Sequence, residues 1–191
     1  MTKTRLEAFS DGVIAILITI MVLELKVPEG ATFDDLRHVS GEIFLYALSF
    51  VFLGIYWNNH HHMLHATSRV SGGILWANSH LLFWLSLVPF VTSWMGEDAH
   101  APLPTATYGV VLLCAAIAYT ILQAAIIKVD GQNSKLRAAV GRDRKGKISA
   151  GLYVAAVLLA YVSPWMSHGI YITVALIWLV PDKRIEAALG R

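Results

Sequence analysis

Charged residues are scarce in this chain, and their scarcity excludes an ordinary soluble domain. Aspartate, glutamate, lysine and arginine together make up 15% of the 191 residues, whereas hydrophobic residues make up 56%. Soluble domains carry about 25% charged residues. The composition is therefore typical of an integral membrane protein. The formal net charge of +2 is too small to indicate a nucleic-acid partner.

The chain has one cysteine, and it lacks the short motifs that mark common enzyme chemistries. The single cysteine, Cys114, cannot form an internal disulfide, and its apolar surroundings favour a small buried hydrophobic residue. The sequence holds no zinc-type cysteine spacing, no glycine-rich phosphate loop, no Gly-x-Ser-x-Gly and no His-Glu-x-x-His. We therefore expect no enzyme, no cofactor and no structural metal.

Long apolar runs are what the chain has instead. A membrane-spanning helix needs about 20 mostly apolar residues, and six segments approach this length. They are residues 8–27, 43–63, 72–95, 105–128, 147–163 and 167–181. The first run is too long for the core of a signal peptide, so we expect it to stay in the membrane. The last two are short and close together, which leaves a re-entrant hairpin as the alternative. The sequence thus predicts an all-α, polytopic membrane protein, with six transmembrane helices forming one domain over residues 1–191.

Basic residues concentrate on one side of these predicted spans. If the N-terminus is inside the cell, the inner segments hold 13 of the 15 lysines and arginines, and only Lys26 and Arg37 lie outside. The inner residues are Lys3, Arg5, Arg69, Lys128, Lys135, Arg137, Arg142, Arg144, Lys145, Lys147, Lys183, Arg184 and Arg191. Because such residues favour the cytoplasmic side, both termini are predicted to be cytoplasmic. The basic loop near residues 128–147 could also contact anionic lipid or nucleic acid.

Ser10 and Asp11 stand at the start of the first span, where polar and charged groups are costly and usually mark function. An α-helix turns about 100° per residue, so both lie about 120–140° around the helix from Ile16. The inner ends of the next two spans carry further polar side chains, Trp57, His60 and Asn78. We predict a buried polar network that links the first three spans.

An apolar stripe with one hydroxyl occupies the other side of the first span. Gly12, Thr19, Ile20 and Leu23 all fall within about 60° of Ile16. The residues alone leave two interpretations open. The stripe could pack against neighbouring helices, or it could line a pore that is gated by apolar rings and contains a hydroxyl ring. Thr19 could also bond only to its own helix.

Four histidines lie at the inner end of the second span: His60, His61, His62 and His65. His61 and His65 are one helical turn apart, a spacing that could hold a metal ion, although interfacial histidines are the alternative. A small secondary transporter or metal carrier that uses these histidines is therefore the rival function. Transporters usually show broken helices around a central site, whereas the first four spans are predicted to have uninterrupted centres.

Several of these residues form a pattern that resembles the transmembrane protein 175 family. Its signature is an arginine, three residues and then Phe-Ser-Asp, which here are Arg5, Phe9, Ser10 and Asp11. Further matches are YWNNHH, LWAN and LVPF in the second and third spans. The later spans agree only in number and hydropathy. The sequence departs from the family pattern at residues 62–64, where a basic-apolar-aromatic run is expected.

The resemblance implies a potassium-selective cation channel without the usual filter loop. This chain holds one six-helix unit, as the bacterial members of the family do. The resemblance therefore implies a homotetramer in which the first helices line a central pore. The constricting residue of the family lies seven positions after the signature phenylalanine, so the resemblance implies a constriction at Ile16. It also implies further apolar layers at Ile20 and Leu23 and a selectivity layer at Thr19. The residues expected to hold the first helix in place are Arg5, Phe9, Ser10, Asp11, Trp57, His60 and Asn78. Potassium ions, the lipid of a bacterial plasma membrane and further copies of the chain are the implied partners.

Overall fold

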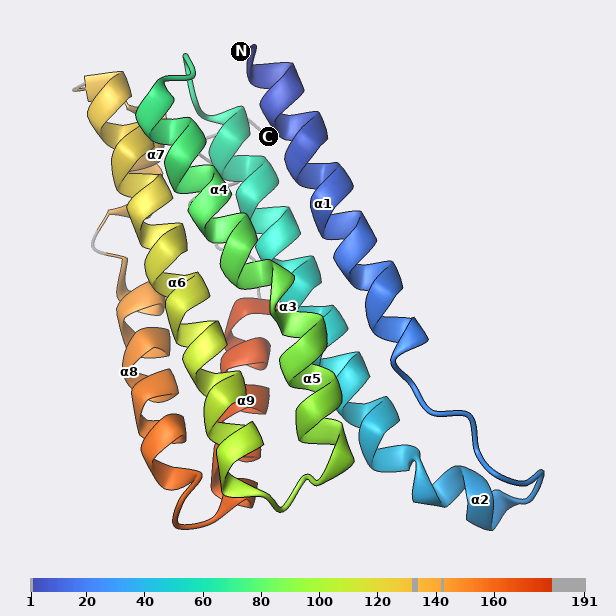
Figure 1. The fold of residues 1–191 in the computed structure, drawn as a ribbon. Coiled ribbons are helices and arrows are strands. Elements are labelled where there is room, and N and C mark those ends of the chain that lie inside the picture. The colour runs from blue at the N-terminus through green and yellow to red at the C-terminus, as the bar shows by residue number, and fades with distance from the viewer. Residues whose placement is uncertain (1, 132–133, 142, 180–191) are drawn as a thin grey trace.

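The computed structural model describes residues 2–131, 134–141 and 143–179, and within these ranges the regular structure is entirely helical. The helices form an elongated bundle, with α1 along one side (Figure 1). In chain order they are α1 (Lys3–Leu23), α2 (Phe33–His38), α3 (Ser40–His65), α4 (Gly72–Ser86), α5 (Val88–Glu97), α6 (Pro102–Asp130), α7 (Lys135–Val140), α8 (Arg144–Leu159) and α9 (Pro164–Leu179).

Four of the predicted spans coincide with segments that are long and apolar enough to cross a membrane. These are α1, α3, the α4–α5 pair and α6. The hairpin of α8 and α9 occupies the last two predicted spans, but each helix has only 16 residues. A helix of that length rises about 24 Å, less than the roughly 30 Å hydrocarbon core of a bilayer. Residues 180–181 of the sixth predicted span lie outside the described residues, and the count of six spans stays a prediction.

The prediction of an uninterrupted third span is wrong, because its helix breaks at Leu87. The α4 helix ends at Ser86 and α5 begins at Val88. Pro89 lies in the first turn of α5 and has no N–H group to continue the helical hydrogen bonds. The N–H of Leu87 instead donates to the carbonyl of Trp84, three residues back. The segment therefore consists of two helices joined at a bend (Figure 1).

The short helix α2 lies outside the predicted spans, at the end of the bundle opposite the N-terminus (Figure 1). Thr32 caps it, and the Thr32 N–H donates to the Asp35 carboxylate at 2.9 Å, which completes a capping box. Hydrogen bonds from Thr32 hold the pKa of the exposed Asp35 carboxyl below its ordinary value. Local capping chemistry therefore explains a helix that hydropathy did not predict.

A set of hydroxyl groups connects helices inside the apolar core. The Thr92 and Ser49 hydroxyls are 2.7 Å apart, and Ser49 is 3.0 Å from the Tyr108 hydroxyl. Nearby, the Tyr171 hydroxyl donates to the Thr105 carbonyl at 2.8 Å. Because hydrocarbon offers no partners to polar groups, buried hydroxyls in a membrane protein pair with one another or with the backbone. These bonds tie α5 to α3, α3 to α6 and α6 to α9.

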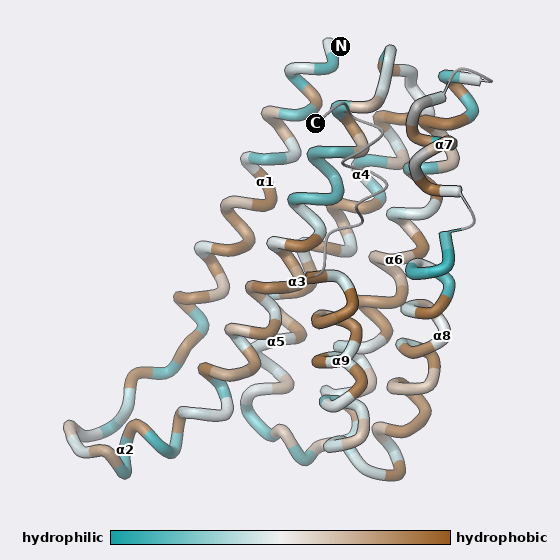
Figure 2. The backbone as a smooth tube through the Cα atoms, turned by 180° about the vertical axis from the view of Figure 1, so that it is seen from behind, coloured by the Kyte–Doolittle hydropathy of each residue, from teal (hydrophilic) through white to brown (hydrophobic). Residues whose placement is uncertain are grey.

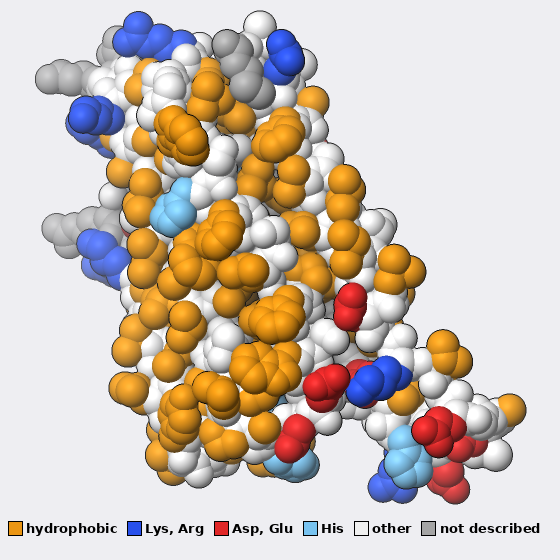
Figure 3. All heavy atoms as spheres, in the orientation of Figure 1, with side chains coloured by type: hydrophobic (Ala, Val, Ile, Leu, Met, Phe, Trp, Pro, Cys, Tyr) orange, Lys and Arg blue, Asp and Glu red, His pale blue; other side chains and the backbone are white. Residues whose placement is uncertain are grey.

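The surface has an apolar middle and charged ends. Hydrophobic side chains cover the central part of the face in Figure 3, with lysine and arginine at the N-terminal end and acidic side chains beside α2. The apolar parts of the long helices also lie at the middle of the bundle when it is seen from behind (Figure 2). A bilayer requires this distribution, because its core is apolar and its two surfaces are polar.

Candidate functional site

The first helix has one packed side and one open side. It contacts α3, α4 and α5. Its buried residues are Leu6, Ser10, Ile14, Leu17 and Met21. The residues of the stripe defined above are exposed: Gly12, Ile16, Thr19, Ile20 and Leu23. The exposed fraction is 57% for Ile16 and 80% for Leu23. The stripe therefore lies on the side of α1 that the described helices of the chain leave uncovered.

Thr19 contributes the one hydroxyl in this stripe. Its Oγ1 donates a hydrogen bond to the carbonyl of Ile16 at 2.9 Å, within the same helix. The hydroxyl proton is thus directed toward the backbone, and the oxygen keeps lone pairs that can accept from, or coordinate, a group outside the helix. This geometry suits an oxygen that faces a cation better than one that faces an anion.

A chain of buried hydrogen bonds fixes the packed side of α1. The Asn78 side-chain nitrogen donates to Ser10 Oγ at 3.0 Å, and Ser10 Oγ donates to the Leu6 carbonyl at 2.9 Å. At the other end, His60 Nε2 lies 2.6 Å from Asn78 Oδ1. Because Asn78 Oδ1 can only accept, Nε2 of His60 carries the proton. All three side chains are buried, so the chain joins α1, α3 and α4 inside the bundle.

Asp11 is held by a separate contact. Trp57 Nε1 donates to its Oδ1 at 3.0 Å. Asp11 is half-buried and Trp57 is exposed, so this bond lies at the edge of the bundle rather than in its core. The predicted polar network therefore has two parts, one buried through Ser10 and one partly exposed through Asp11.

The structure does not bring the other two signature residues to these contacts. Arg5 is exposed, and its backbone N–H donates to the capping Thr2 hydroxyl. Phe9 is 53% exposed. Their role in holding the helix stays a prediction. The sequence analysis did not predict a further contact, in which Lys3 Nζ donates to the His65 carbonyl at 2.7 Å and so joins the start of α1 to the end of α3.

The histidine cluster forms ring contacts rather than a ligand set. The ring centroid of His61 lies 5.7 Å from that of His62 and 6.2 Å from that of His65. The protonated Nε2 of His60 already bonds to Asn78. Among the described residues, no group of three or more histidine, cysteine or acidic side chains is arranged to hold a metal ion.

These features are those of a multi-pass helical membrane protein. Its first helix is packed against the bundle on one side and exposed on the other. A family model described as "Endosomal/lysosomal potassium channel TMEM175" matches residues 5–89, from the signature arginine to the proline of α5. The chain belongs to this family of channels, the transmembrane protein 175 family.

Known proteins are similar to this chain along almost its whole length. A protein of Chryseobacterium sp. (strain P1-3) named "Potassium channel HX13_20290" is 54% identical over 189 residues, which cover 99% of this chain and 98% of the relative. "Potassium channel Cha6605_3372" of Chamaesiphon minutus is 29% identical, with 90% and 91% covered. The crystal structure of a lysosomal potassium-selective channel TMEM175 homolog from Chamaesiphon minutus has a TM-score of 0.83 at 27% identity, covering 94% of this chain and 97% of that one. This chain therefore shares its fold with that crystal structure beyond α5, where the match to the family model ends.

Proposed function

We propose that this protein is a potassium channel that conducts ions passively through a homotetrameric pore lined by α1. The observation that carries the proposal is the open face of α1. That face bears apolar side chains and a hydroxyl, while the opposite face is packed. The channel names of the relatives support the same function.

In this proposal the apolar rings and the hydroxyl ring have different tasks. Ile16, Ile20 and Leu23 lie on one face, with axial spacings of about 6 Å and 4.5 Å. In a tetramer they form successive apolar layers, and the Ile16 layer constricts the pore. Apolar rings control conduction by excluding water. The Thr19 oxygens replace part of the hydration shell of the ion and favour potassium over sodium.

The hydrogen-bonded side of α1 sets the rotation of the helix in the proposed pore. Ser10 and Ile16 are about 120° apart around the helix axis. When Asn78 and His60 hold Ser10 against α3 and α4, the Ile16 stripe must point away from them, toward the pore axis. The Asp11–Trp57 bond supplies a second fixed point on another side of the helix.

The basic residues support an orientation with both termini in the cytoplasm of a bacterial cell. Most lysines and arginines of the chain fall on one side of a six-span topology. In Figure 3 the lysines and arginines seen beside the N-terminus are at one end of the apolar band. Under this proposal α8 and α9 cross the plasma membrane as the fifth and sixth spans.

A secondary transporter is the second candidate, and the break of the third span at Leu87 is the observation that favours it. Transporters build their binding sites on discontinuous helices. Flux through purified protein in liposomes distinguishes the two functions. A channel passes potassium passively, and its flux is proportional to small driving forces. A flux that saturates and requires a proton or metal gradient would contradict the channel and favour the transporter.

The oligomeric state is tested separately. Native mass spectrometry of the detergent-purified protein is expected to give a tetramer. A monomeric protein that still conducts potassium would contradict a pore built from four copies of α1.

A further inference from the structure

The helix α8 has one side that the other described helices leave exposed. It packs against α6 and α9, and its buried residues are Ser149, Tyr153 and Ala156. The exposed residues on the opposite side lie within about 80° of Arg144 around the helix axis. We call them the outward face of α8: Arg144, Lys147, Ile148, Gly151, Val154 and Leu158. The first turn of this face is basic, and the rest is apolar.

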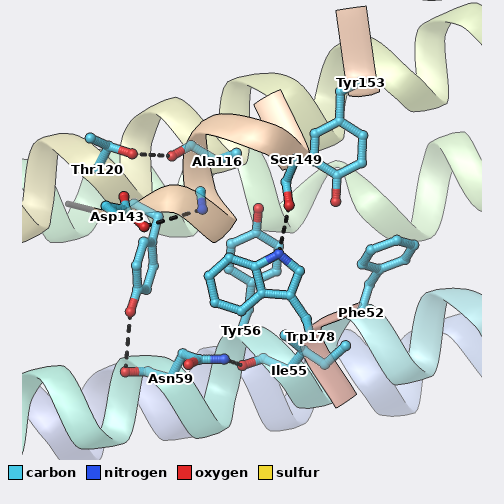
Figure 4. A pocket seen from close by; sticks show the side chains of 12 residues that line it. Phe52, Ile55, Tyr56, Asn59, Ala116, Thr120, Asp143, Ser149, Tyr153 and Trp178 are labelled. Carbon is cyan, nitrogen blue, oxygen red and sulfur yellow. Dashed lines mark hydrogen bonds between the residues drawn. The ribbon is translucent and has the colours of Figure 1, made fainter. Parts of the chain in front are cut away.

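The basic turn lies at the depth that the phosphates of a bilayer would occupy. In Figure 1, α8 starts near the middle of the bundle, whereas α6 extends well past it. Asp143, directly before α8, lines a small cavity with Thr120 of α6 and Asn59 of α3 (Figure 4). Thr120 is about 27 Å along α6 from Pro102, and Asn59 is about 28 Å along α3 from Ser40. The hydrocarbon core is roughly 30 Å thick. If α3 and α6 start at one membrane surface, the first turn of α8 therefore reaches the other.

Arg144 and Lys147 carry positive charges that the described part of the chain does not neutralise. Neither side chain forms an ion pair or a hydrogen bond with a described residue. By contrast, Nζ of Lys26, at the opposite end of the bundle, lies 3.7 Å from a Glu42 oxygen and 4.0 Å from a Glu97 oxygen. The two cations on α8 are thus available to an anion from outside the chain.

The carboxylate next to this turn does not take that place. Asp143 caps α8, and its Oδ1 accepts from the Gly146 N–H at 3.1 Å. Its side chain lines the cavity between α8 and its neighbours, as Figure 4 shows, and so lies on the packed side of the helix. The anion that meets the basic turn must therefore come from the surroundings of the protein.

Beyond the basic turn, the outward face offers a strip for an acyl chain. Ile148 is 56% exposed and Leu158 is 66% exposed. Gly151 lies between them, and nothing is within 4 Å of the position that a Cβ atom would take there. An acyl chain along this strip would meet apolar side chains at both ends and bare backbone in the middle. The face therefore combines a basic end with an apolar length, which matches the two parts of an anionic phospholipid.

We propose that the outward face of α8 binds an anionic phospholipid. The guanidinium of Arg144 donates to two oxygens of the lipid phosphate, and the ammonium of Lys147 adds a second positive charge. One acyl chain lies along Ile148, Gly151 and Leu158. Because α1 packs against α3, α4 and α5, this site is apart from the proposed pore, and its test requires no ion flux.

Phosphatidylglycerol is the probe, and phosphatidylcholine with the same acyl chains is its zwitterionic counterpart. The detergent-purified full chain is titrated with each lipid, and native mass spectrometry counts the lipids bound per subunit. The first phosphatidylglycerol should bind about tenfold more tightly, because each of two basic side chains favours an anionic headgroup. Glycerol phosphate, which lacks acyl chains, should not displace it. Equal affinity for the two lipids, or displacement by an equal concentration of glycerol phosphate, would overturn the proposal.

The decisive variant combines Arg144→Gln with Lys147→Gln. Both side chains are exposed, so the fold is expected to survive, and the preference for phosphatidylglycerol should fall to about twofold or less. The matched control combines Lys128→Gln with Arg137→Gln, which removes two other exposed basic side chains, from α6 and α7. Lys128 is about 39 Å along α6 from Pro102, beyond the depth of the phosphates, so the control should keep the preference.

A second pair of substitutions separates charge from a disturbed helix. Exchanging the residues, Arg144→Lys with Lys147→Arg, keeps both charges and should retain most of the preference. The proposal is wrong if the glutamine pair keeps the preference or if the control pair loses it equally. A changed number of subunits with an unchanged lipid preference would show that this face contacts another copy of the chain, which would also overturn the proposal.

Discussion

The side-chain nitrogen of Asn78 on α4 donates a hydrogen bond to the Ser10 hydroxyl on α1 at 3.0 Å, inside the apolar core. Asn78 uses its carbonyl oxygen for His60 on α3 at the same time. One amide therefore satisfies two buried polar groups from two other helices. Removing it leaves His60 Nε2 without its acceptor and leaves Ser10 Oγ with its bond to the Leu6 carbonyl alone.

The Asn78→Leu variant tests the importance of this amide. Leucine has a similar size but bonds to neither Ser10 nor His60, so we expect a loss of roughly 1–2 kcal/mol of stability. The measurement is the thermal midpoint of the purified protein. Asn58→Leu, which changes an exposed asparagine on α3, is the control and should have little effect. A double-mutant cycle with Ser10→Ala should show that the two losses are not additive.

The Asp11–Trp57 bond should matter for assembly more than for ion selectivity. Asp11→Ala and Trp57→Phe each remove this bond, so we expect both to reduce the fraction of assembled oligomer in size-exclusion chromatography. Combining them should add little, because the same bond is lost in each case. Normal assembly of Asp11→Ala together with an altered potassium-to-sodium permeability ratio would contradict this role and place Asp11 in the ion path.

The Ile16→Asn variant tests the proposed constriction. An amide at this layer holds water, so the barrier from dewetting should fall and potassium flux into liposomes should rise severalfold. Ala15→Asn is the matched control, since Ala15 is also exposed on α1 but lies about 100° away around the helix. If both variants raise the flux equally, the change reflects a disturbed helix rather than a widened pore.

The Thr19→Val variant tests the proposed selectivity layer. Valine keeps the shape of threonine but removes the oxygen. If each oxygen contributes about 1 kcal/mol to the preference for potassium, the permeability ratio of potassium to sodium should fall roughly fivefold or more. Thr19→Ser keeps the hydroxyl and should retain most of the ratio, which reversal-potential measurements in bilayers would report. An unchanged ratio in Thr19→Val would rule out the selectivity role.

Gly109 on α6 allows the close approach of α9. A Cβ atom there would lie in severe overlap with the Tyr171 hydroxyl and 3.0 Å from Val157 Cγ2. Gly109→Ala should therefore lower stability by about 1–3 kcal/mol and weaken the Tyr171–Thr105 hydrogen bond. Gly151→Ala is the control, because nothing lies within 4 Å of its added Cβ. Adding Tyr171→Phe to Gly109→Ala should recover part of the loss, since it removes the overlapping oxygen.

The sequence predicted the positions of the long helices well and their interruptions poorly. Hydropathy located α1, α3 and α6 because the length of an apolar run must match the bilayer. It missed the break at Leu87, although Pro89 was visible, because some membrane helices tolerate proline when neighbouring groups satisfy the backbone. It also missed α2, whose capping box between Thr32 and Asp35 is a local signal rather than a hydrophobic one.

The candidate site was predictable in part. The family signature directed attention to Ser10 and Asp11, and helical geometry separated both from the Ile16 stripe. The hydrogen-bond partners of Ser10 and Asp11 could not be predicted from the sequence, because several polar groups lie at a similar depth in the second and third spans. The structure pairs Ser10 with Asn78 and Asp11 with Trp57.

The residues of α1 that share a face follow from the sequence, because the helical repeat is set by covalent geometry and backbone hydrogen bonding. Which of these faces is packed and which is open depends on the neighbouring helices in the folded chain. In a soluble protein, polarity would mark the difference, since exposed faces are hydrophilic. In a membrane both faces are apolar, and Ile14 is buried while Ile16 is exposed. The distinction rests on the packing of α1 against α3, α4 and α5, and on the hydrogen bonds that fix its rotation.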